Sequence, residues 1–379
     1  MQLDSYRHVH CIGAGGIGIS GVMKFLFAKD ISVSGSDAKQ SMITDGLVEL
    51  GIPVSIGQDA SNIPSETDLV VYTEAATAEN AERAAATSRN IPQMGHFDFL
   101  GELSKDYRTI CITGTNGKST TTAMAGKIFI DAGCDPTVFV GSIVPGWKYG
   151  NVAVGKSDIM IIEGDEYLRK VLKLFPETTV ITNVELDHTD VYKDLADVEA
   201  MFGQLGRQTQ KTVWMTMKDQ QKCFYRGDGS ARIGIYGYEL MQHAFTSWDD
   251  PLPNVDRYFA NGTQSLDILE QDGAIHKAKK LGTLTLGIPG LFNMMNAFAA
   301  KAVALEYGIG LQKILESLAS FTGIWRRFER VGIFNGAQII SDYGHHPTAV
   351  KATLEGAREF FPTSRIVLLF EPHQHNRTK

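Results

Sequence analysis

Short apolar runs alternate with stretches of helical periodicity over the first hundred residues. The runs HVHCIGA, ISVSGSD and DLVVYTEA predict strands, and GISGVMKFLFAKD and SMITDGLVELG predict helices between them. Strands separated by helices of that length form right-handed βαβ units and therefore a parallel sheet. We expect an N-terminal unit with a Rossmann-like α/β fold.

The same alternation restarts beyond Lys105. A strand predicted over 109–113 leads into a glycine loop and then into a helix that begins near Lys118. Two further apolar strands, in DIMIIEGDE and TTVITNVELDH, each run into acidic residues, and open α/β sheets bind their ligands at such strand ends. We therefore expect a second nucleotide-binding α/β unit.

Residues 221–290 have a different pattern, rich in turns and short alternating segments. ARIGIYGY and SLDILEQDGAIHKA predict an antiparallel β excursion attached to the second unit. NMMNAFAAKAVALEYG then predicts an amphipathic helix that ends at Gly308.

A third unit begins after GIWRRFER. It is predicted to contain a hairpin that turns at Asn335-Gly336, a helix with Pro347 in its first turn, and a buried strand in SRIVLLFEP. The predicted domains are 1–105, 106–328 and 329–379. Since independent domains usually have about 100–150 residues, we expect the third to be incomplete.

Composition narrows the class of protein. Of the 379 residues, 43% are hydrophobic and 21% charged, which is typical of a globular protein, and the net charge of −7 argues against nucleic acid as a partner. The four cysteines are far apart, which disfavours a disulfide framework or a metal cluster. No signal region and no apolar run long enough for a membrane span is evident, so we expect a cytoplasmic protein.

The N-terminal glycines form the first candidate binding motif. Gly13, Gly15 and Gly18 have the G-x-G-x-x-G spacing, and Asp37 follows about 20 residues later, where an acid can bind a ribose. Taken alone, the motif suggests a nicotinamide-dependent dehydrogenase. Glycine turns and helix amides bind any diphosphate, however, and a UDP-sugar supplies one as well as NAD does.

The second candidate motif is GTNGKST, at 114–120. Its glycines let backbone amides face a polyphosphate, Lys118 can neutralise the β- and γ-phosphate oxygens, and the Ser119 hydroxyl can ligate magnesium. The spacing is not that of the full Walker motif, because Ile112 stands where its first glycine would lie. An ordinary glycine-rich turn is the alternative, but the strand before it, the helix after it and the motifs downstream favour a phosphate site.

Acidic side chains supply a candidate magnesium site. Glu163 and His188 are each predicted to end a strand beside the phosphate loop, and magnesium prefers oxygen ligands, so the histidine is the less usual member. We interpret Glu166 and Glu185 as capping or solvated loop acids.

Several motifs in order resemble the Mur ligases of peptidoglycan synthesis. These are GTNGKSTTTAM, EGDE, TNVELDH, WRRFE, DYGHHPTAV and FEPHQHNRT, and the resemblance extends over the whole chain. It implies three domains, which bind a UDP-sugar, bind ATP, and help to hold ATP and the amino acid. It also implies an ATP-driven ligase that joins L-alanine to UDP-N-acetylmuramate through an acyl phosphate, with ATP and Mg²⁺ as cofactors and a monomer or homodimer as the functional form.

The resemblance, together with the two glycine motifs, assigns roles to individual residues. Lys118, Glu163 and His188 are the catalytic candidates, and Ser119, Glu163 and His188 the metal ligands. The ATP-binding candidates are Gly114, Thr115, Asn116, Gly117, Lys118, Ser119, Thr120, Asn296, Arg326, Arg327 and Asp342. The UDP-sugar candidates are Gly13, Gly15, Gly16, Ile17, Gly18 and Asp37. The amino-acid candidates are Tyr343, His345, His373 and Arg377.

Two departures from the family pattern leave alternatives open. Phe292 replaces a histidine on the adenine side, and EGDEYL replaces EADESD on the substrate side. The tyrosine in EGDEYL is similar to that of the ligase that attaches a whole tripeptide during peptidoglycan recycling. A ligase that adds a peptide is therefore an alternative to the alanine-adding enzyme. The incomplete third domain leaves a second alternative, a nucleotide-binding or UDP-sugar-binding remnant without full activity.

Overall fold

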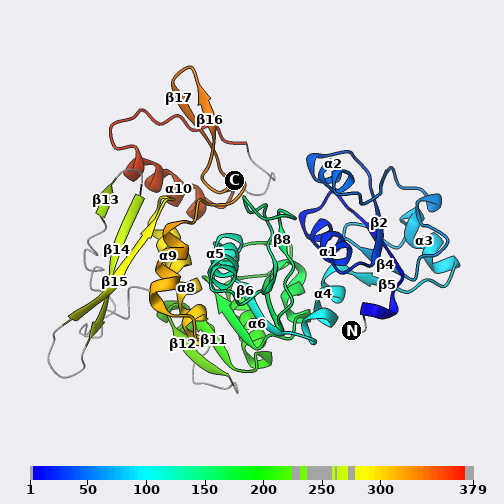
Figure 1. Cartoon of the computed structure of the whole chain (residues 1–379), viewed down its shortest axis with the longest axis horizontal. Coiled ribbons are helices and arrows are strands. Elements are labelled where there is room, and N and C mark those ends of the chain that lie inside the picture. The colour runs from blue at the N-terminus through cyan, green and yellow to red at the C-terminus, as the bar shows by residue number, and fades with distance from the viewer. Residues whose placement is uncertain (1–2, 224–230, 237–257, 261–262, 272–277, 372–379) are drawn as a thin grey trace.

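A computed structural model describes residues 3–223, 231–236, 258–260, 263–271 and 278–371 of the chain. Three units follow one another along the molecule: an N-terminal α/β unit, a larger central unit, and a C-terminal hairpin and helix above the central one (Figure 1). The predicted fold class is therefore confirmed.

The N-terminal unit is a five-stranded parallel sheet covered by helices. Its elements are η1 (Leu3–Ser5), β1 (His8–Ile12), α1 (Ile17–Ala28), β2 (Ser32–Asp37), α2 (Met42–Glu49), β3 (Val54–Ile56), η2 (Ala60–Asn62), β4 (Leu69–Tyr72), α3 (Ala81–Ser88), β5 (Gln93–Gly95) and α4 (His96–Ser104). The strand order is β3-β2-β1-β4-β5, so the order reverses at β1, directly before the glycine loop. A reversal of this kind opens the crevice in which such sheets bind ligands.

The central unit is built on a second sheet, ordered β12-β11-β10-β6-β9-β7-β8. Its first elements are β6 (Arg108–Thr113), α5 (Lys118–Asp131), β7 (Thr137–Phe139), β8 (Val152–Ala153), β9 (Ile159–Glu163), η3 (Tyr167–Lys173), β10 (Thr178–Ile181), α6 (Leu195–Gln208), β11 (Thr212–Met215), α7 (Met217–Cys223) and β12 (Arg232–Ile235). The β6 strand lies between β9 and β10, so the loops that follow these three strands meet at one edge of the sheet.

The predicted antiparallel excursion is present in the described residues, and residues 224–230, 237–257, 261–262 and 272–277 of its predicted range lie outside them. Its strands are β13 (Tyr258–Ala260), β14 (Thr263–Gln271) and β15 (Ala278–Leu286), followed by α8 (Leu291–Glu306) and α9 (Leu311–Ala319). The prediction was wrong for the ARIGIYGY segment, because β12 pairs in parallel with β11 at the edge of the central sheet. Alternating polar and apolar residues suit an edge strand of either direction, so the pattern alone does not separate the two.

The C-terminal unit contains β16 (Glu329–Phe334), β17 (Ala337–Ser341) and α10 (Pro347–Phe360). The predicted hairpin turn is confirmed: Asn335 and Gly336 both have positive φ, at 47° and 82°, as a two-residue hairpin loop requires. The predicted helix is confirmed too, with Pro347 in its first turn.

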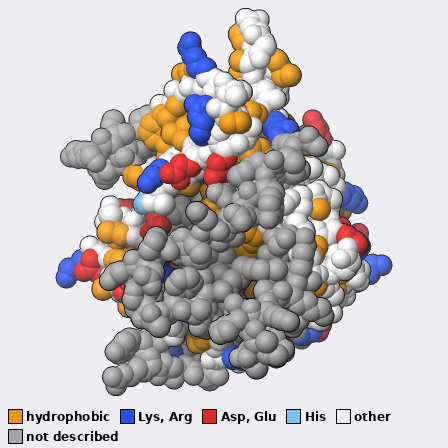
Figure 2. Space-filling view, turned by 90° about the vertical axis from the view of Figure 1, so that its left-hand side faces the viewer, with side chains coloured by type: hydrophobic (Ala, Val, Ile, Leu, Met, Phe, Trp, Pro, Cys, Tyr) orange, Lys and Arg blue, Asp and Glu red, His pale blue; other side chains and the backbone are white. Residues whose placement is uncertain are grey.

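The buried strand predicted in SRIVLLFEP was wrong. Residues 365–371 have no strand pairing, and Val367 and Leu369 are 65% and 92% exposed. Figure 2 shows apolar side chains on the upper part of one face, where the C-terminal unit lies. An apolar run becomes a buried strand only beside other strands, and no strand of the described residues pairs with this segment.

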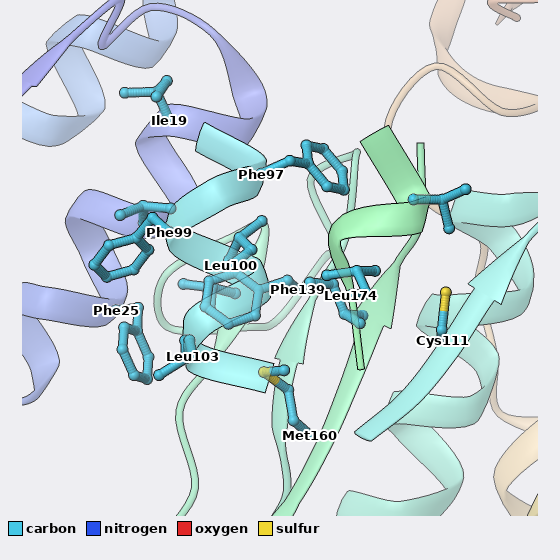
Figure 3. Packing of buried hydrophobic residues seen from close by; sticks show 14 of the residues in the cluster. Ile19, Phe25, Phe97, Phe99, Leu100, Leu103, Cys111, Phe139, Met160 and Leu174 are labelled. Carbon is cyan, nitrogen blue, oxygen red and sulfur yellow. The ribbon is translucent and has the colours of Figure 1, made fainter. Parts of the chain in front are cut away.

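A continuous hydrophobic core joins the N-terminal and central units. Helix α4 lies between α1 and the central sheet, with Phe99 and Leu103 packed among Phe25, Met160 and residues around them (Figure 3). The rings of Phe25 and Phe139 are 5.4 Å apart across the boundary. The two glycine loops are thus held in a fixed relation by core packing.

Candidate active site

The N-terminal glycine loop is shaped by contacts with β2 and α4. Gly13 has φ +92°, a conformation that favours glycine, and the amide of Gly15 donates to Asp37 Oδ2 at 2.8 Å. A Cβ on Gly18 would lie 2.4 Å from Cε1 of His96, so the histidine ring packs directly on the first turn of α1. In this structure Asp37 therefore orders the loop itself.

The central glycine loop is bound to the loop after β10. The Thr115 amide donates to Asn183 O at 3.0 Å, the Asn116 amide donates to Asn183 Oδ1 at 3.0 Å, and Thr182 Oγ1 donates to Asn116 O at 2.6 Å. Gly117 has φ +86° and precedes α5, which leaves the first-turn amides of that helix facing the cavity. The loop thus has the form of an anion-binding site.

Lys118 lies at the centre of a buried charge cluster. Its Nζ is 2.9 Å from both carboxylate oxygens of Glu166 and donates to Gly114 O at 2.7 Å and to Thr115 O at 3.0 Å. Burial disfavours the charged lysine, but the neighbouring Glu166 carboxylate outweighs burial and raises the pKa of Lys118. The interpretation of Glu166 as a solvated or capping acid was wrong, because this side chain is buried and paired.

His188 does not end a strand, as was predicted, but lies in the loop beyond β10, with φ +52°. Its Nε2 is 3.7 Å from Glu166 Oε1, and that carboxylate raises the pKa of His188. The ring of Tyr167 lies 4.9 Å from the His188 ring, and the Tyr167 hydroxyl donates to Asp190 at 3.0 Å. Glu166 thus lies between two of the three predicted catalytic side chains, Lys118 and His188.

Ser119 and Glu163 lie together beside the phosphate loop. Ser119 Oγ donates to Glu163 Oε1 at 2.8 Å, and the Gly141 amide donates to Glu163 Oε2 at 2.6 Å. Burial raises the pKa of Glu163, as expected for a carboxylate whose charge has little solvent around it. Two oxygen ligands fit magnesium, which usually takes one or two protein groups and completes its shell with phosphate and water. Within the described residues no group of three His, Cys, Asp or Glu gathers as an all-protein cage.

The predicted adenine side lies over the same loop. A Cβ on Gly117 would be 2.4 Å from Asn296 Oδ1, so Asn296 on α8 packs against the glycine loop. Asn296 also donates to Asn293 Oδ1 at 3.2 Å. Phe292, which replaces the family's histidine, lines the cavity one turn earlier on α8.

The hinge between central and C-terminal units carries the next group of predicted residues. Arg326 and Phe328 have positive φ, at 56° and 48°. The carboxylate of Asp342 accepts the amide of Phe328 at 2.9 Å and that of Gly344 at 2.6 Å, which ties the strained hinge to the end of β17. The guanidinium groups of Arg326 and Arg327 lie 4.8 and 5.4 Å from the ring centre of Tyr343.

Of the predicted amino-acid residues, Tyr343 and His345 lie together, with ring centres 5.3 Å apart and His345 Nδ1 3.0 Å from Tyr343 O. His373 and Arg377 lie outside the described residues.

One cavity of about 910 Å³ brings most of these residues together from all three units. The predicted site residues that line it are Gly16, Ile17, Gly18, Thr115, Asn116, Gly117, Lys118, Ser119, Thr120, Glu163, His188, Asn296, Arg327, Asp342, Tyr343 and His345. The lining does not include five further predicted site residues: Gly13, Gly15, Asp37, Gly114 and Arg326.

Sequence reasoning missed three residues of this wall. These are His96, Tyr167 and Lys170, which all line the cavity. His96 belongs to no motif. Tyr167 lies in EGDEYL and Lys170 just beyond it, and sequence reasoning assigned neither residue a role. The signal that could have found Glu166 is its position in EGDE, three residues after the candidate ligand Glu163.

No helix of the described residues is long and apolar enough to cross a membrane.

Two glycine loops follow parallel strands of two sheets and face one cavity with a lysine, a serine and a buried glutamate, an arrangement that defines an α/β nucleotide-binding enzyme. Family models match the chain in three places: the Mur ligase family catalytic domain at 8–108, the Mur ligase middle domain at 112–304, and the Mur ligase glutamate ligase domain at 326–378. The chain belongs to the Mur ligase family, whose members are ATP-dependent ligases.

Individual relatives agree with the family match. The chain is 36% identical to UDP-N-acetylmuramate–L-alanine ligase of Salinibacter ruber, over 100% of this chain and 77% of that protein. The crystal structure of UDP-N-acetylmuramate-alanine ligase MurC from Thermotoga maritima superposes with a TM-score of 0.81 at 28% identity, covering 98% of this chain and 82% of that one. The UDP-N-acetylmuramate:L-alanyl-gamma-D-glutamyl-meso-diaminopimelate ligase of Neisseria meningitides shares the fold, with a TM-score of 0.70 at 24% identity over 84% of this chain and 99% of that chain.

Proposed function

We propose that this protein joins L-alanine to UDP-N-acetylmuramate in an ATP-dependent reaction of peptidoglycan synthesis. The observation that carries the proposal is the single cavity onto which the N-terminal and central glycine loops both open. A ligase of this kind must bring a carboxylate on a UDP-sugar to the γ-phosphate of ATP, and the two loops offer one anion site for each nucleotide. The named activity of the 36% identical relative supports the same assignment.

In this proposal the chain's residues act by positioning and charge neutralisation. The substrate carboxylate attacks the γ-phosphorus and ADP leaves; the amino group of L-alanine then attacks the acyl carbon, and phosphate leaves with the bonding electrons. Lys118 exchanges its contacts with Gly114 O and Thr115 O for phosphate oxygens, while Glu166 keeps its ammonium in place. Arg327 lines the same cavity and adds a second positive charge whose field reaches Glu163.

A magnesium ion fits the Ser119 and Glu163 oxygens, with His188 as a further candidate ligand. When bound, the ion supplies charge neutralisation between the phosphates. Glu163 is held toward Ser119 by the Gly141 amide, so the carboxylate is oriented in advance. Because ATP and UDP-sugars are cytoplasmic metabolites, we place the reaction in the cytoplasm.

Phosphate release in a coupled assay tests the proposal. Release should require ATP, Mg²⁺, UDP-N-acetylmuramate and L-alanine together, and mass spectrometry should detect the alanyl product. Lys118→Ala should abolish release, whereas Lys127→Ala, a lysine of the same helix paired with Asp131 away from the cavity, should not. Release that does not depend on an amino acid, or no release at all, would contradict the proposal and favour the binding-remnant alternative.

The same assay separates the other candidates. Turnover with L-alanyl-γ-D-glutamyl-meso-diaminopimelate but not with L-alanine would favour the peptide-adding alternative, for which the present support is likeness of fold. NADH should not raise the melting temperature of the protein, and stabilisation by NADH but not by UDP-N-acetylmuramate would restore the dehydrogenase interpretation.

A further inference from the structure

The cavity wall between the two glycine loops carries a second cation, Lys170. It lies in η3, lines the cavity, and its side chain is 13% exposed. Its Nζ is 2.7 Å from Asp165 Oδ2, 5.1 Å from the Tyr167 ring centre and 5.7 Å from the Phe97 ring centre. An ion pair and two aromatic rings therefore fix the ammonium at the boundary between the central and N-terminal units.

His96, from the N-terminal unit, lines the same cavity as Lys170. Its ring fills the space beside Gly18 on the first turn of α1, and it precedes Phe97, whose ring lies near the Lys170 ammonium. Burial and, after it, the charge of Lys170 lower the pKa of His96 to about 4. At neutral pH this imidazole is therefore neutral, and its ring packs on Gly18 of the glycine loop.

We propose that Lys170 and His96 form the binding site for the carboxylate of UDP-N-acetylmuramate. This site lies between the diphosphate of that substrate, bound at Gly18, and the γ-phosphate of ATP, bound at Lys118. The inference deepens the proposed function and rests on it. In the substrate the muramic acid sugar separates the diphosphate from the reacting lactyl carboxylate, and Lys170 lines the same cavity as Gly18 and Lys118.

The charges of the wall suit this role. Lys118 already contacts two carbonyl oxygens and Glu166, and its place in the phosphate loop commits it to ATP. Lys170 is partly balanced by Asp165, so it can orient a carboxylate without neutralising it fully. The carboxylate oxygen then keeps its nucleophilicity toward phosphorus, which an exclusive ion pair in the ground state would reduce.

Two ligands that differ in the lactyl carboxylate test the inference by calorimetry, without ATP or amino acid. UDP-N-acetylmuramate carries that group and UDP-N-acetylglucosamine lacks it. Lys170→Met should lower the affinity for UDP-N-acetylmuramate about tenfold to a hundredfold and change the affinity for UDP-N-acetylglucosamine by no more than about twofold. Lys170→Arg should restore most of the lost affinity.

Lys173→Met is the matched control, because Lys173 lies in the same segment and forms an ion pair of the same 2.7 Å length, with Asp98, but is 41% exposed and outside the cavity lining. It should alter neither affinity. Equal losses for both ligands in Lys170→Met, no loss, or no binding of UDP-N-acetylmuramate to the unaltered protein would each overturn the inference. If Lys170→Met has a lower melting temperature than the unaltered protein, Lys170→Gln serves as a second uncharged variant.

The measurement needs no turnover, so it is separate from the test of the proposed function. An inactive protein that still shows the carboxylate-dependent loss would refute the ligase proposal alone. An active enzyme without that loss would refute the role of Lys170 alone.

Discussion

The ammonium of Lys118 lies 2.9 Å from both oxygens of Glu166, a side chain that is 4% exposed. The pair joins the helix after the phosphate loop to the segment after β9, two parts of the chain that β6 and β9 bring together. Because Glu166 also lies 3.7 Å from His188, one buried carboxylate orders two of the three predicted catalytic residues.

Removing one partner of this pair should be worse for stability than removing both. Lys118→Met leaves a buried carboxylate without its cation and should lower the free energy of unfolding by about 2–3 kcal/mol. This is at or below the smallest loss usual for breaking a buried ion pair, because the Lys118 side chain is partly exposed. Lys118→Met/Glu166→Gln should recover part of that loss. Urea denaturation of both variants at pH 7.5 measures the difference, and a double variant less stable than the single one would contradict the assignment.

The effects of substitutions at Gly18 and His96 on stability should depend on each other, because the two residues pack together. Gly18→Ala places a methyl group 2.4 Å from the His96 ring and should cost about 1–2 kcal/mol of unfolding free energy. Gly18→Ala/His96→Ala frees the space, so the effects of the two substitutions should not add. Gly46→Ala, where a Cβ meets nothing within 4 Å, is the control and should not destabilise. Full additivity in the double variant would show that the ring does not limit this position.

Lys24 should make stability depend on pH in the alkaline range. It is buried between the N-terminal and central units, donates to Asn151 Oδ1 at 2.8 Å, and burial lowers its pKa from 10.5 to about 8. Between pH 8 and 10.5 the unfolded chain therefore binds more protons at this lysine, so the contribution of Lys24 to the unfolding free energy rises with pH, by about 3 kcal/mol in total.

Lys24→Met should lose that rise. Unfolding free energies of the variant and the unaltered protein, compared at pH 7.5 and 9.5, should shift in favour of the unaltered protein as pH increases. Lys313→Met removes an exposed lysine on α9, and its unfolding free energy should equal that of the unaltered protein at both pH values. A constant difference between Lys24→Met and the unaltered protein would show that Lys24 titrates normally.

Asp342 should hold the hinge of the C-terminal unit closed. Its carboxylate accepts the amides of Phe328 and Gly344, so Asp342→Ala should speed hydrogen exchange at these two amides by about tenfold to a hundredfold. Amides of α5 should keep their protection. If ATP also binds through Asp342, as the family resemblance implies, KM for ATP should rise in the same variant; unchanged exchange would refute the hinge role.

Local features of the fold were predictable because each depends on neighbours in sequence. Strand β6, the glycine loop and α5 follow from an apolar run, two glycines and a lysine, and the hairpin at Asn335-Gly336 follows from a dipeptide that tolerates positive φ. The two glycine motifs also indicated phosphate-type sites without any knowledge of the tertiary structure, since backbone amides at a helix start bind anions in any fold.

Features that depend on partners distant in sequence were not predictable. The direction of β12 is set by β11 at the sheet edge, and residues 365–371 are exposed because no described strand lies beside them, although their composition is that of a core strand. Glu166 resembled a solvated acid because its burial depends on Lys118, 48 positions earlier.

The sequence by itself determined the class of fold, the two glycine loops and the family, because these are written in short ordered motifs. Only the tertiary structure decided that both loops open on one cavity, that Glu166 joins Lys118 to His188, and that His96 and Lys170 line that same cavity. The physical reason is that burial and charge pairing depend on which surfaces the core of α1, α4 and the central sheet brings into contact.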